Sequence, residues 1–283
     1  MTSPGACCAV TGTGGYVGSI VARALERGSG DVLRLSRTGS QPAGARFTLE
    51  EGVARGALEG AQALVHAAWD FSAYSRAEIE RNNVAGSIRL FDHAAAAGVE
   101  RLVFVSSLSA FPGCRSMYGR AKLAVEEHVL SLGGAVVRPG LVWGTDGGSL
   151  YATLAGLARK APVLPVFAGE SRKLHLAHED DLAGLVVSLV EAERVPAQPV
   201  AAAAAEPLSL ADILRRIAAA HGRRLRIVHV PWRAAWAGLR ALELAHLDPP
   251  FRSDSVVSLI SVQQRPFGPE GAPAGFRPFM PDG

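Results

Sequence analysis

TGTGGYVG, at residues 11–18, is the stretch of sequence that decides the fold. The apolar run Ala6–Val10 before it predicts a β-strand, and the amphipathic stretch Tyr16–Arg27 after it predicts a helix that ends at Gly28. Glycines in such a strand–turn–helix unit let backbone N–H groups approach a phosphate closely, at the positive end of the helix dipole. The glycines at 12, 15 and 18 therefore predict a dinucleotide site, with a tight turn that serves packing alone as the alternative.

Outward from this unit, apolar strands alternate with helical patterns through the first half of the chain. Four more strands are predicted, at Val32–Leu35, Ala63–Ala67, Leu102–Val105 and Ala135–Val137. Helices are predicted at Ala77–Ala97 and Tyr118–Leu132. This alternation predicts an α/β protein, with a Rossmann-type doubly wound parallel sheet covered by helices on both faces.

The pattern loosens after Gly144, which predicts a second, smaller domain. The elements expected there are a helix at Leu150–Lys160, a strand–helix unit at Lys173–Ala177 and Asp180–Ala192, a strand at Pro199–Ala205, a helix capped by Ser209 and a strand at Leu225–Val230. We expect residues 1–146 and 173–205 to form the dinucleotide-binding domain. Residues 147–172 and 206–283 are expected to form a small C-terminal substrate-binding domain.

Composition and charge exclude several classes of protein. In 283 residues, 29 Lys and Arg against 26 Asp and Glu give a net charge of only +3, without the cationic excess that nucleic-acid binding needs. No apolar run reaches the ~18–20 residues of a membrane span, and residues 1–6 carry no signal-peptide pattern. We therefore expect a cytoplasmic protein with no nucleic-acid or membrane partner. His66, His175 and His178 are scattered, so no metal site is expected.

The end of the second predicted strand bears on the choice between NAD and NADP. A NAD site usually has an acidic residue there, which hydrogen-bonds the adenosine ribose. Here Ser36 and Arg37 follow the strand, and no carboxylate occurs between Asp31 and Glu50. A guanidinium can bind a 2′-phosphate with two hydrogen bonds, although Arg37 could also be an ordinary surface arginine. We expect NADP as the cofactor, with NAD as the alternative.

Tyr118 and Lys122 are the most informative pair, because the chain has only four tyrosines and three lysines. At a spacing of four residues on a helix the two side chains share a face, so the ammonium can lower the pKa of the phenol. That pKa is about 10 in water and must fall to about 7 for a base at neutral pH, which takes about 4 kcal/mol of preferential phenolate stabilisation. Upstream, a serine pair, Ser106-Ser107, follows a strand where α/β sheets bind ligands, and a hydroxyl there can bond a substrate oxygen.

Taken together, these features resemble one known family. The motifs are the Thr-Gly-x-x-Gly-x-x-Gly turn, Ala67-Ala68 after a strand, Asn83, Ser106-Ser107, Tyr118-x-x-x-Lys122 and Arg138-Pro139-Gly140. In this order, over residues 6–205, they resemble the extended short-chain dehydrogenase/reductases, that is, the NAD(P)-dependent epimerase/dehydratase family, which acts mostly on nucleotide sugars.

The resemblance implies a role for each matching residue. Tyr118 would be the acid–base, and Lys122 would lower its pKa and hold the nicotinamide ribose. Ser107, the second of the serine pair, would orient the reacting oxygen, and Asn83 would support the lysine. The residues expected at the cofactor are Gly12, Thr13, Gly15, Tyr16, Val17, Gly18, Ser36, Arg37, Ala67, Ala68, Tyr118, Lys122 and Pro139.

The sequence departs from the family pattern around the substrate and the adenine. No Asp follows Phe47 at the place where the family often holds the adenine. No arginine stands at the aligned position within 171–176 that often binds a sugar-nucleotide diphosphate, although Arg172 or Lys173 could replace it. Trp69 and Trp143, with Phe71 and Phe111, could instead line an apolar pocket or pack in the core. The residues expected at the substrate are Trp69, Ser109, Trp143 and Arg172.

The sequence therefore predicts an enzyme that transfers a hydride at a carbinol or carbonyl carbon of a small molecule. A nucleotide sugar or related metabolite is the expected substrate, and a small apolar ketone is the alternative. Leu108 stands where a dehydratase would carry a carboxylate, which leaves a reductase or an epimerase. A regulator that senses NADP without chemistry is the alternative from another class, although such proteins usually lack an intact Tyr-x-x-x-Lys. A homodimer is one option for the assembly.

Overall fold

The computed structural model describes most of the chain, and its residues divide into two compact units. Unit 1 comprises Met1–Ser107, Ala121–Arg138 and Glu179–Ala202, and unit 2 comprises Leu108–Arg120, Pro139–His178 and Ala203–Gly283. Helix α4 (Met117–Ser131) is shared by the two units. The described residues are 7–28, 30–39, 44–73, 75–144, 150–167, 172–245, 247, 252–261, 263, 266–267 and 275–281.

Unit 1 is built on an eight-stranded sheet in the order β12-β7-β6-β5-β1-β2-β3-β4. Its strands are β1 (Cys7–Thr11), β2 (Val32–Ser36), β3 (Gly44–Thr48), β4 (Gly52–Val53), β5 (Ala61–His66), β6 (Arg101–Val105), β7 (Ala135–Pro139) and β12 (Val200–Ala202). The run from β7 to β3 pairs in parallel, and β4 pairs antiparallel with β3. The predicted Rossmann-type parallel sheet is confirmed.

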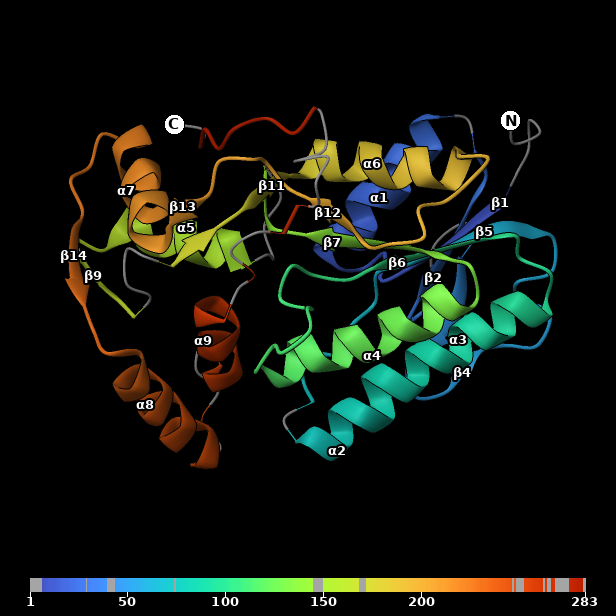
Figure 1. Ribbon diagram of the computed structural model, residues 1–283, viewed down its shortest axis with the longest axis horizontal. Coiled ribbons are helices and arrows are strands. Elements are labelled where there is room, and N and C mark those ends of the chain that lie inside the picture. Colours follow the sequence, from blue (N-terminus) through green and yellow to red (C-terminus); the bar gives the residue numbers. More distant parts are fainter. Residues whose placement is uncertain are drawn as a thin grey trace. The chain divides into compact units, whose positions relative to one another are not determined.

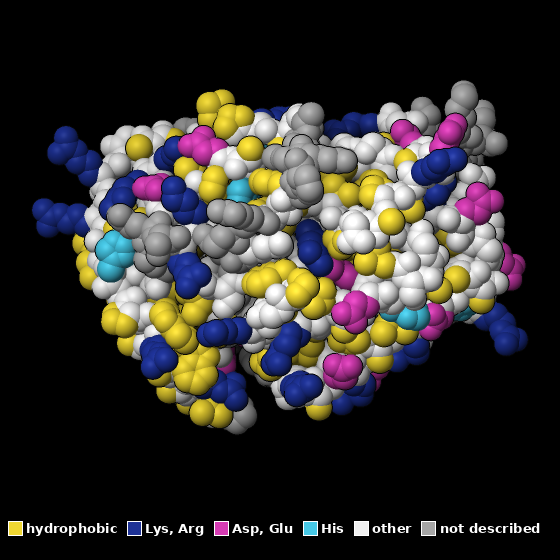
Figure 2. Space-filling model, in the orientation of Figure 1, with side chains coloured by type: hydrophobic (Ala, Val, Ile, Leu, Met, Phe, Trp, Pro, Cys, Tyr) yellow, Lys and Arg dark blue, Asp and Glu magenta, His cyan; other side chains and the backbone are white. Residues whose placement is uncertain are grey.

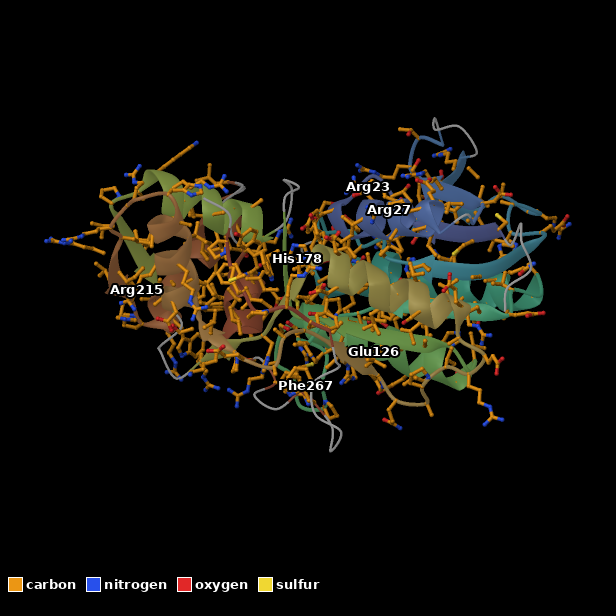
Figure 3. All side chains as sticks on the ribbon, turned by 90° about the horizontal axis from the view of Figure 1, so that it is seen from above. Arg23, Arg27, Glu126, His178, Arg215 and Phe267 are labelled. Carbon is orange, nitrogen blue, oxygen red and sulfur yellow. The ribbon has the colours of Figure 1, made fainter. Side chains whose placement is uncertain are left out.

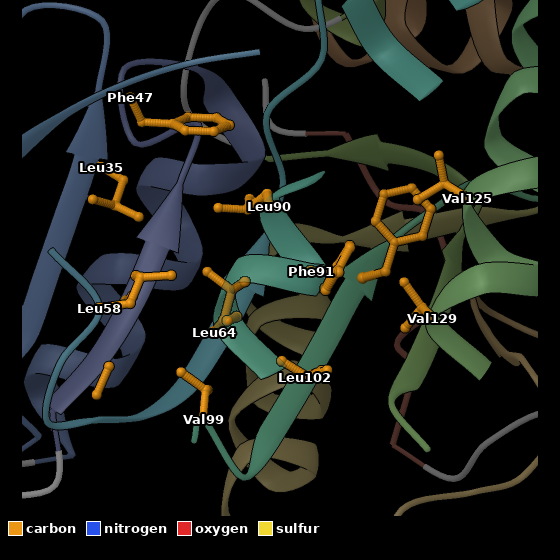
Figure 4. Close-up of a cluster of buried hydrophobic side chains, with 14 of the residues drawn as sticks. Leu35, Phe47, Leu58, Leu64, Leu90, Phe91, Val99, Leu102, Val125 and Val129 are labelled. Atoms are coloured by element: carbon orange, nitrogen blue, oxygen red, sulfur yellow. The ribbon is translucent and has the colours of Figure 1, made fainter. Parts of the chain in front are cut away.

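Helices cover both faces of this sheet (Figure 1). α1 (Tyr16–Arg27) and α6 (Glu179–Glu191) pack together on one face, and α3 (Ala85–Ala96) and α4 lie on the other. Strands covered on both sides must be apolar along their whole length, which explains the short apolar runs of the sequence. Leu64, Phe91 and Phe104 are fully buried in the resulting core, part of which Figure 4 shows.

The helix predicted at Ala77–Ala97 is interrupted. It begins as the short helix α2 (Arg76–Glu78), continues as a π-helix, η1 (Ile79–Val84), and becomes α3 at Ala85. Ser75 and Glu78 form a capping box, with the Glu78 N–H donating to Ser75 Oγ at 3.1 Å and the Ser75 N–H to Glu78 Oε2 at 2.8 Å. Apolar periodicity does not distinguish α-helix from π-helix, and wider π-turns occur often at functional positions.

Unit 2 combines short paired strands with helices. Its elements are β8 (Leu141–Trp143), α5 (Leu150–Lys160), β9 (Val163–Val166), β10 (Lys173–Leu174), β11 (Leu176–His178), β13 (Leu208–Ser209), α7 (Leu210–Ala220), β14 (Arg226–His229), α8 (Trp232–Leu244) and α9 (Ser253–Ile260). β11 pairs in parallel with β8, β14 in parallel with β9, and β10 antiparallel with β13. Apolar faces of α5 and α7 build its core.

Two of the strands predicted between residues 173 and 205 need correction. The strand predicted at Lys173–Ala177 is two strands, β10 and β11, because they pair with different partners and His175 between them accepts the Leu141 N–H. The strand predicted at Pro199–Ala205 is shorter, at Val200–Ala202. α8 and α9 were not predicted, since α8 lacks the polar face that makes a helix visible in sequence. No helix in the described ranges is both long and apolar enough to cross a bilayer.

Candidate active site

The glycine turn lies between β1 and α1 and packs against the end of β5. Gly12 has φ +72°, and a Cβ there would lie 2.8 Å from the Ala68 nitrogen, so no other residue fits without a shift of backbone. The Gly15 N–H donates to the Gly12 carbonyl at 2.8 Å and closes the turn. Gly15 precedes α1, and Val17 and Gly18 lie in its first turn. Ala67 and Ala68, both predicted cofactor residues, therefore lie directly beside the turn.

A buried hydrogen-bond network next to the turn fixes the positions of Ala67 and Ala68. The Thr11 hydroxyl accepts the N–H groups of Ala67 and Ala68 at 3.1 and 3.2 Å and lies 2.6 Å from His66 Nδ1. Burial, with the charge of Lys122, lowers the pKa of His66 to about 3, so the ring is neutral. Because the hydroxyl already accepts two N–H groups, it donates to Nδ1, and Nε2–H donates to Ser87 Oγ at 2.8 Å. His66 thus links the end of β5 to Thr11 and to α3 through its two ring nitrogens.

The turn has the features of a site for a dinucleotide pyrophosphate. The Thr13 hydroxyl is buried, yet it has no hydrogen-bond partner among the described residues. Among the described residues, no side chain caps the N-terminus of α1 and none approaches Gly14 within contact distance. Unsatisfied donors at the positive end of a helix dipole suit a phosphate. Tyr16, at the start of α1, donates its hydroxyl to Glu179 Oε2 of α6 at 2.7 Å and holds the two helices together.

β2 ends at Ser36, one residue later than predicted, and Arg37 follows it directly. Ser36 Oγ accepts the Gly39 N–H at 3.2 Å, which shapes the turn after the strand. Arg37 is exposed and has no ion-pair partner in the described part of the chain. Two neighbouring arginines differ in this respect, since Arg34 pairs with Glu26 and Arg46 with Glu51, both at 2.8 Å. The Arg37 guanidinium is therefore available to an anionic ligand.

Lys122 is buried, which is rare for a lysine. Its Nζ donates to the Val105 carbonyl at the end of β6 at 2.8 Å and lies 4.1 Å from the centroid of the Trp69 ring and 4.6 Å from that of Phe104. Both rings offer a cation–π contact. Burial lowers the pKa of Lys122 from 10.5 to about 7. The ammonium is thus held at a fixed place, and near neutral pH it is close to losing its proton.

Glu126 opposes this loss of charge. It lies one turn after Lys122 on α4 and is fully buried in unit 1, and its negative charge raises the pKa of Lys122. Glu126 is labelled in Figure 3. Arg138 donates to both of its oxygens, from Nε at 2.9 and 3.1 Å and from Nη2 at 2.5 Å, and Ser106 Oγ also donates to it. The sequence analysis missed Glu126, although Tyr118, Lys122 and Glu126 recur at a spacing of four residues.

This cluster separates the roles of the two serines. Ser106 is buried and bonded to Glu126, whereas Ser107 is half-buried, which favours Ser107 as the hydroxyl that meets a substrate. Asn83, in the π-helix η1, receives the Asp70 N–H at 2.7 Å and donates to the Asp70 carbonyl at 2.9 Å. It therefore fixes the segment next to Trp69, whose ring lies against the Lys122 ammonium.

Tyr118 is the second residue of α4 and is half-buried in unit 2. The N–H groups of Met117 and Tyr118 donate to the two carboxylate oxygens of Asp254, in α9, at 2.9 and 3.0 Å. A Cβ at Gly119 would overlap the Ser109 carbonyl, so glycine lets Ser109 lie against this first turn. Asp254 was also missed, because a carboxylate that caps a helix from 136 residues away leaves no local pattern.

The other residues predicted to contact ligands differ in their surroundings. Trp143 is buried in the core of unit 2, with edge contacts to His178 at 4.5 Å and Phe279 at 5.1 Å between ring centroids. Arg172 is exposed. Pro139, the last residue of β7, is buried, and its carbonyl accepts the Leu108 N–H at 2.9 Å.

Comparisons with known proteins identify similar chains and similar folds. A ceramide reductase from Caulobacter vibrioides is 28% identical over 175 residues, which are 61% of this chain and 54% of the relative. The chain spans about half the length of the curated relatives it matches. A UDP-N-acetylglucosamine 4-epimerase from Bacillus cereus has TM-score 0.67 at 20% identity, over 90% of this chain and 95% of that one. MoeE5 in complex with UDP-glucuronic acid and NAD has TM-score 0.69 at 18% identity, over 80% and 86%.

These solved structures share the fold of this chain. The family assignment rests on the sequence itself, since the model of one family matches residues 8–199, more than half of the chain. That stretch contains the glycine turn, Asn83, the serine pair, Tyr118 and Lys122. The chain belongs to the NAD-dependent epimerase/dehydratase family.

Proposed function

We propose that this protein catalyses NAD(P)-dependent hydride transfer at a carbinol or carbonyl carbon, with Tyr118 as the acid–base. The observation that carries the proposal is the buried ammonium of Lys122, one helical turn after Tyr118. A positive charge kept out of water stabilises a nearby phenolate far more than an exposed lysine does. The nicotinamide, when bound, supplies the group that gives or takes the hydride.

The residues of the chain supply binding, orientation and proton transfer. Tyr118 Oη takes the proton of the carbinol or returns it to the carbonyl oxygen, and Ser107 Oγ donates to that oxygen. Lys122 lowers the pKa of the phenol, and the negative charge of Glu126 favours the protonated form of Lys122. The Thr11–Gly18 turn would hold the pyrophosphate, and the Thr13 hydroxyl, which has no partner in the part of the chain that the structure describes, would be one of its donors.

Arg37 leads us to propose NADP as the preferred cofactor. Its guanidinium is exposed and unpaired among the described residues, at the end of β2, where the adenosine ribose binds in this fold. Arg37→Ala should weaken NADP binding by about 1.5–3 kcal/mol, the range for a hydrogen bond to a charged group, and leave NAD binding nearly unchanged. Titration with each nucleotide measures this. An equal loss for both would mean that Arg37 supports only the local fold.

A nucleotide sugar is the substrate class we propose. The solved structures that share this fold include one described with UDP-glucuronic acid and NAD and one described as a UDP-N-acetylglucosamine 4-epimerase. A lipid or apolar ketone is the second candidate, because the relative from Caulobacter vibrioides is named a ceramide reductase. Leu108 is buried next to Ser107, where a dehydratase would carry a carboxylate, so we propose reduction or epimerisation.

Protection from thermal unfolding distinguishes the two substrates. With NADP present, UDP and dTDP are added to one set of samples and long-chain ketones to another. A ligand at 100 times its dissociation constant adds about 2.7 kcal/mol to the free energy of unfolding, which gives a clear shift of the transition. We expect a nucleoside diphosphate to protect. Protection by an apolar ketone alone would replace the nucleotide-sugar proposal with the second candidate.

A further inference from the structure

Helix α8 combines an apolar sequence with a largely exposed position. Of its thirteen residues, Trp232–Leu244, only Arg233, Arg240 and Glu243 are charged, and the others are apolar or glycine. None of the thirteen is buried. A helix that is apolar on nearly all sides is normally covered by protein or by lipid.

One side of α8 packs against α9. Ala235, Leu239 and Glu243 are half-buried at a spacing of four residues, and α8 packs with α9. Glu243 receives the N–H and the hydroxyl of Ser253, the first residue of α9, at 2.7 and 2.8 Å. These contacts fix α8 on unit 2 and leave its remaining surface open.

The open surface carries a continuous ridge. Trp232, Trp236, Arg240 and Leu244 follow one another at a spacing of four residues, so they lie along one line of the helix. The two tryptophans are 37% and 39% exposed and Leu244 is 67% exposed. Arg233 lies beside this line, with its guanidinium 5.6 Å from the centroid of the Trp232 ring.

The charges of α8 and of the segment that leads into it are almost all of one sign. Residues 221–245, all of which the structure describes, contain five arginines and one acidic residue, Glu243. The Glu243 side chain is only 6% exposed and is occupied by Arg240 and Ser253. Figure 2 shows apolar and cationic side chains gathered over α8. The five arginines are Arg223, Arg224, Arg226, Arg233 and Arg240.

We propose that α8 docks this protein on a membrane surface rich in anionic lipid. The helix would lie in the plane of the headgroups, with Trp232 and Trp236 at the acyl boundary and the arginines against lipid phosphates. Its thirteen residues make it about 20 Å long, shorter than the ~30 Å hydrocarbon core, so it lies on the bilayer and does not cross it.

Charge argues against a second copy of the chain as the occupant. A two-fold interface brings the same patch of both copies together, so the cationic ridge would face itself. An anionic surface instead offers a charge complementary to the arginines of this segment.

Flotation with lipid vesicles tests the proposal without reference to catalysis. The full chain is mixed with vesicles of phosphatidylcholine or of phosphatidylcholine with phosphatidylglycerol. We expect flotation with the anionic vesicles, weakened by added salt, and a blue shift of tryptophan fluorescence. Trp232→Ser/Trp236→Ser should reduce the bound fraction at least tenfold. Leu157→Ser, which removes an apolar side chain of similar exposure from α5, should float like the wild type.

Single arginine variants separate the contribution of charge to vesicle binding from that of apolar contact. Arg233→Ala should weaken partition about fivefold, as expected for one cationic residue at an anionic surface, whereas Arg55→Ala, at an exposed position of unit 1, should have no effect. Circular dichroism and nucleotide binding confirm that each variant is folded. Absence of flotation, equal flotation with neutral vesicles, or a dimer without lipid that Trp232→Ser/Trp236→Ser dissociates would each overturn the proposal, whatever the substrate is.

Discussion

Tyr118→Phe should lower turnover by on the order of 10²–10⁴, with little change in cofactor affinity. The substitution keeps the ring and its packing and removes only the ionisable hydroxyl. The measurement is the rate of change of nicotinamide absorbance with the substrate class that protects the protein from unfolding. Nucleotide titration of the same sample measures cofactor binding.

A matched variant shows whether the effect belongs to the site. Tyr151→Phe removes a hydroxyl from a buried tyrosine of α5, in the core of unit 2, and should keep most of the activity. More than a tenth of wild-type turnover in Tyr118→Phe would refute the acid–base assignment. A wild-type protein that binds NADP and turns over neither class of substrate would favour the regulator that senses NADP without chemistry.

Lys122→Met should reduce turnover at least as strongly and should also weaken cofactor binding. The side chain serves two proposed partners, the phenol of Tyr118 and the nicotinamide ribose, so both properties fall together. This distinguishes it from Tyr118→Phe, which spares binding. Lys160→Met, which removes an exposed lysine of α5, controls for the loss of one positive charge. If Lys122→Met bound the nucleotide as tightly as the wild type does, Lys122 would not hold the nicotinamide ribose.

The same variant has a second signature, in the pH dependence of stability. The pKa of Lys122 is about 7 in the folded protein, against 10.5 for an ordinary lysine. Between these values the unfolded chain binds more protons, so the wild-type free energy of unfolding rises with pH as the cost of the buried charge is relieved. Lys122→Met lacks this rise. Its stability relative to the wild type should fall by on the order of 2–4 kcal/mol from about pH 6 to about pH 10.

Chemical unfolding at a series of pH values measures this difference. Lys160→Met should run parallel to the wild type. If Lys122→Met also ran parallel, the lysine would not be the strained, buried charge on which the proposed function depends.

The fold was predictable because its signal is local. The glycine turn and the short apolar strands each lie in a short stretch of sequence, and together they predict a parallel sheet covered on both faces. The pair Tyr118–Lys122 lies on one helix and is visible for the same reason. Glu126 carries the same spacing but no rare residue type, so it did not stand out. The split of Lys173–Ala177 into two strands depends on which partners the chain meets in space. Asp254 depends on a contact with a helix 136 residues earlier.

The absence of a long apolar run predicts that the chain does not cross a bilayer, but it does not address binding to a membrane surface. Helix α8 is too short to form such a run, and its Ala, Trp and Leu residues show no polar face to mark it as a helix. Only its exposure in the folded protein makes it conspicuous.

The cap that Asp254 provides to α4 has a consequence for biosynthesis. During translation Tyr118 leaves the ribosome well over a hundred residues before Asp254 does. Until Asp254 is synthesised, the first N–H groups of α4 lack the carboxylate that caps them in the folded protein. The glycine turn and most of the parallel sheet need no such late partner. A growing chain can therefore acquire its nucleotide-binding half first, and the helix that carries Tyr118 is completed only when the last part of the polypeptide folds back onto it.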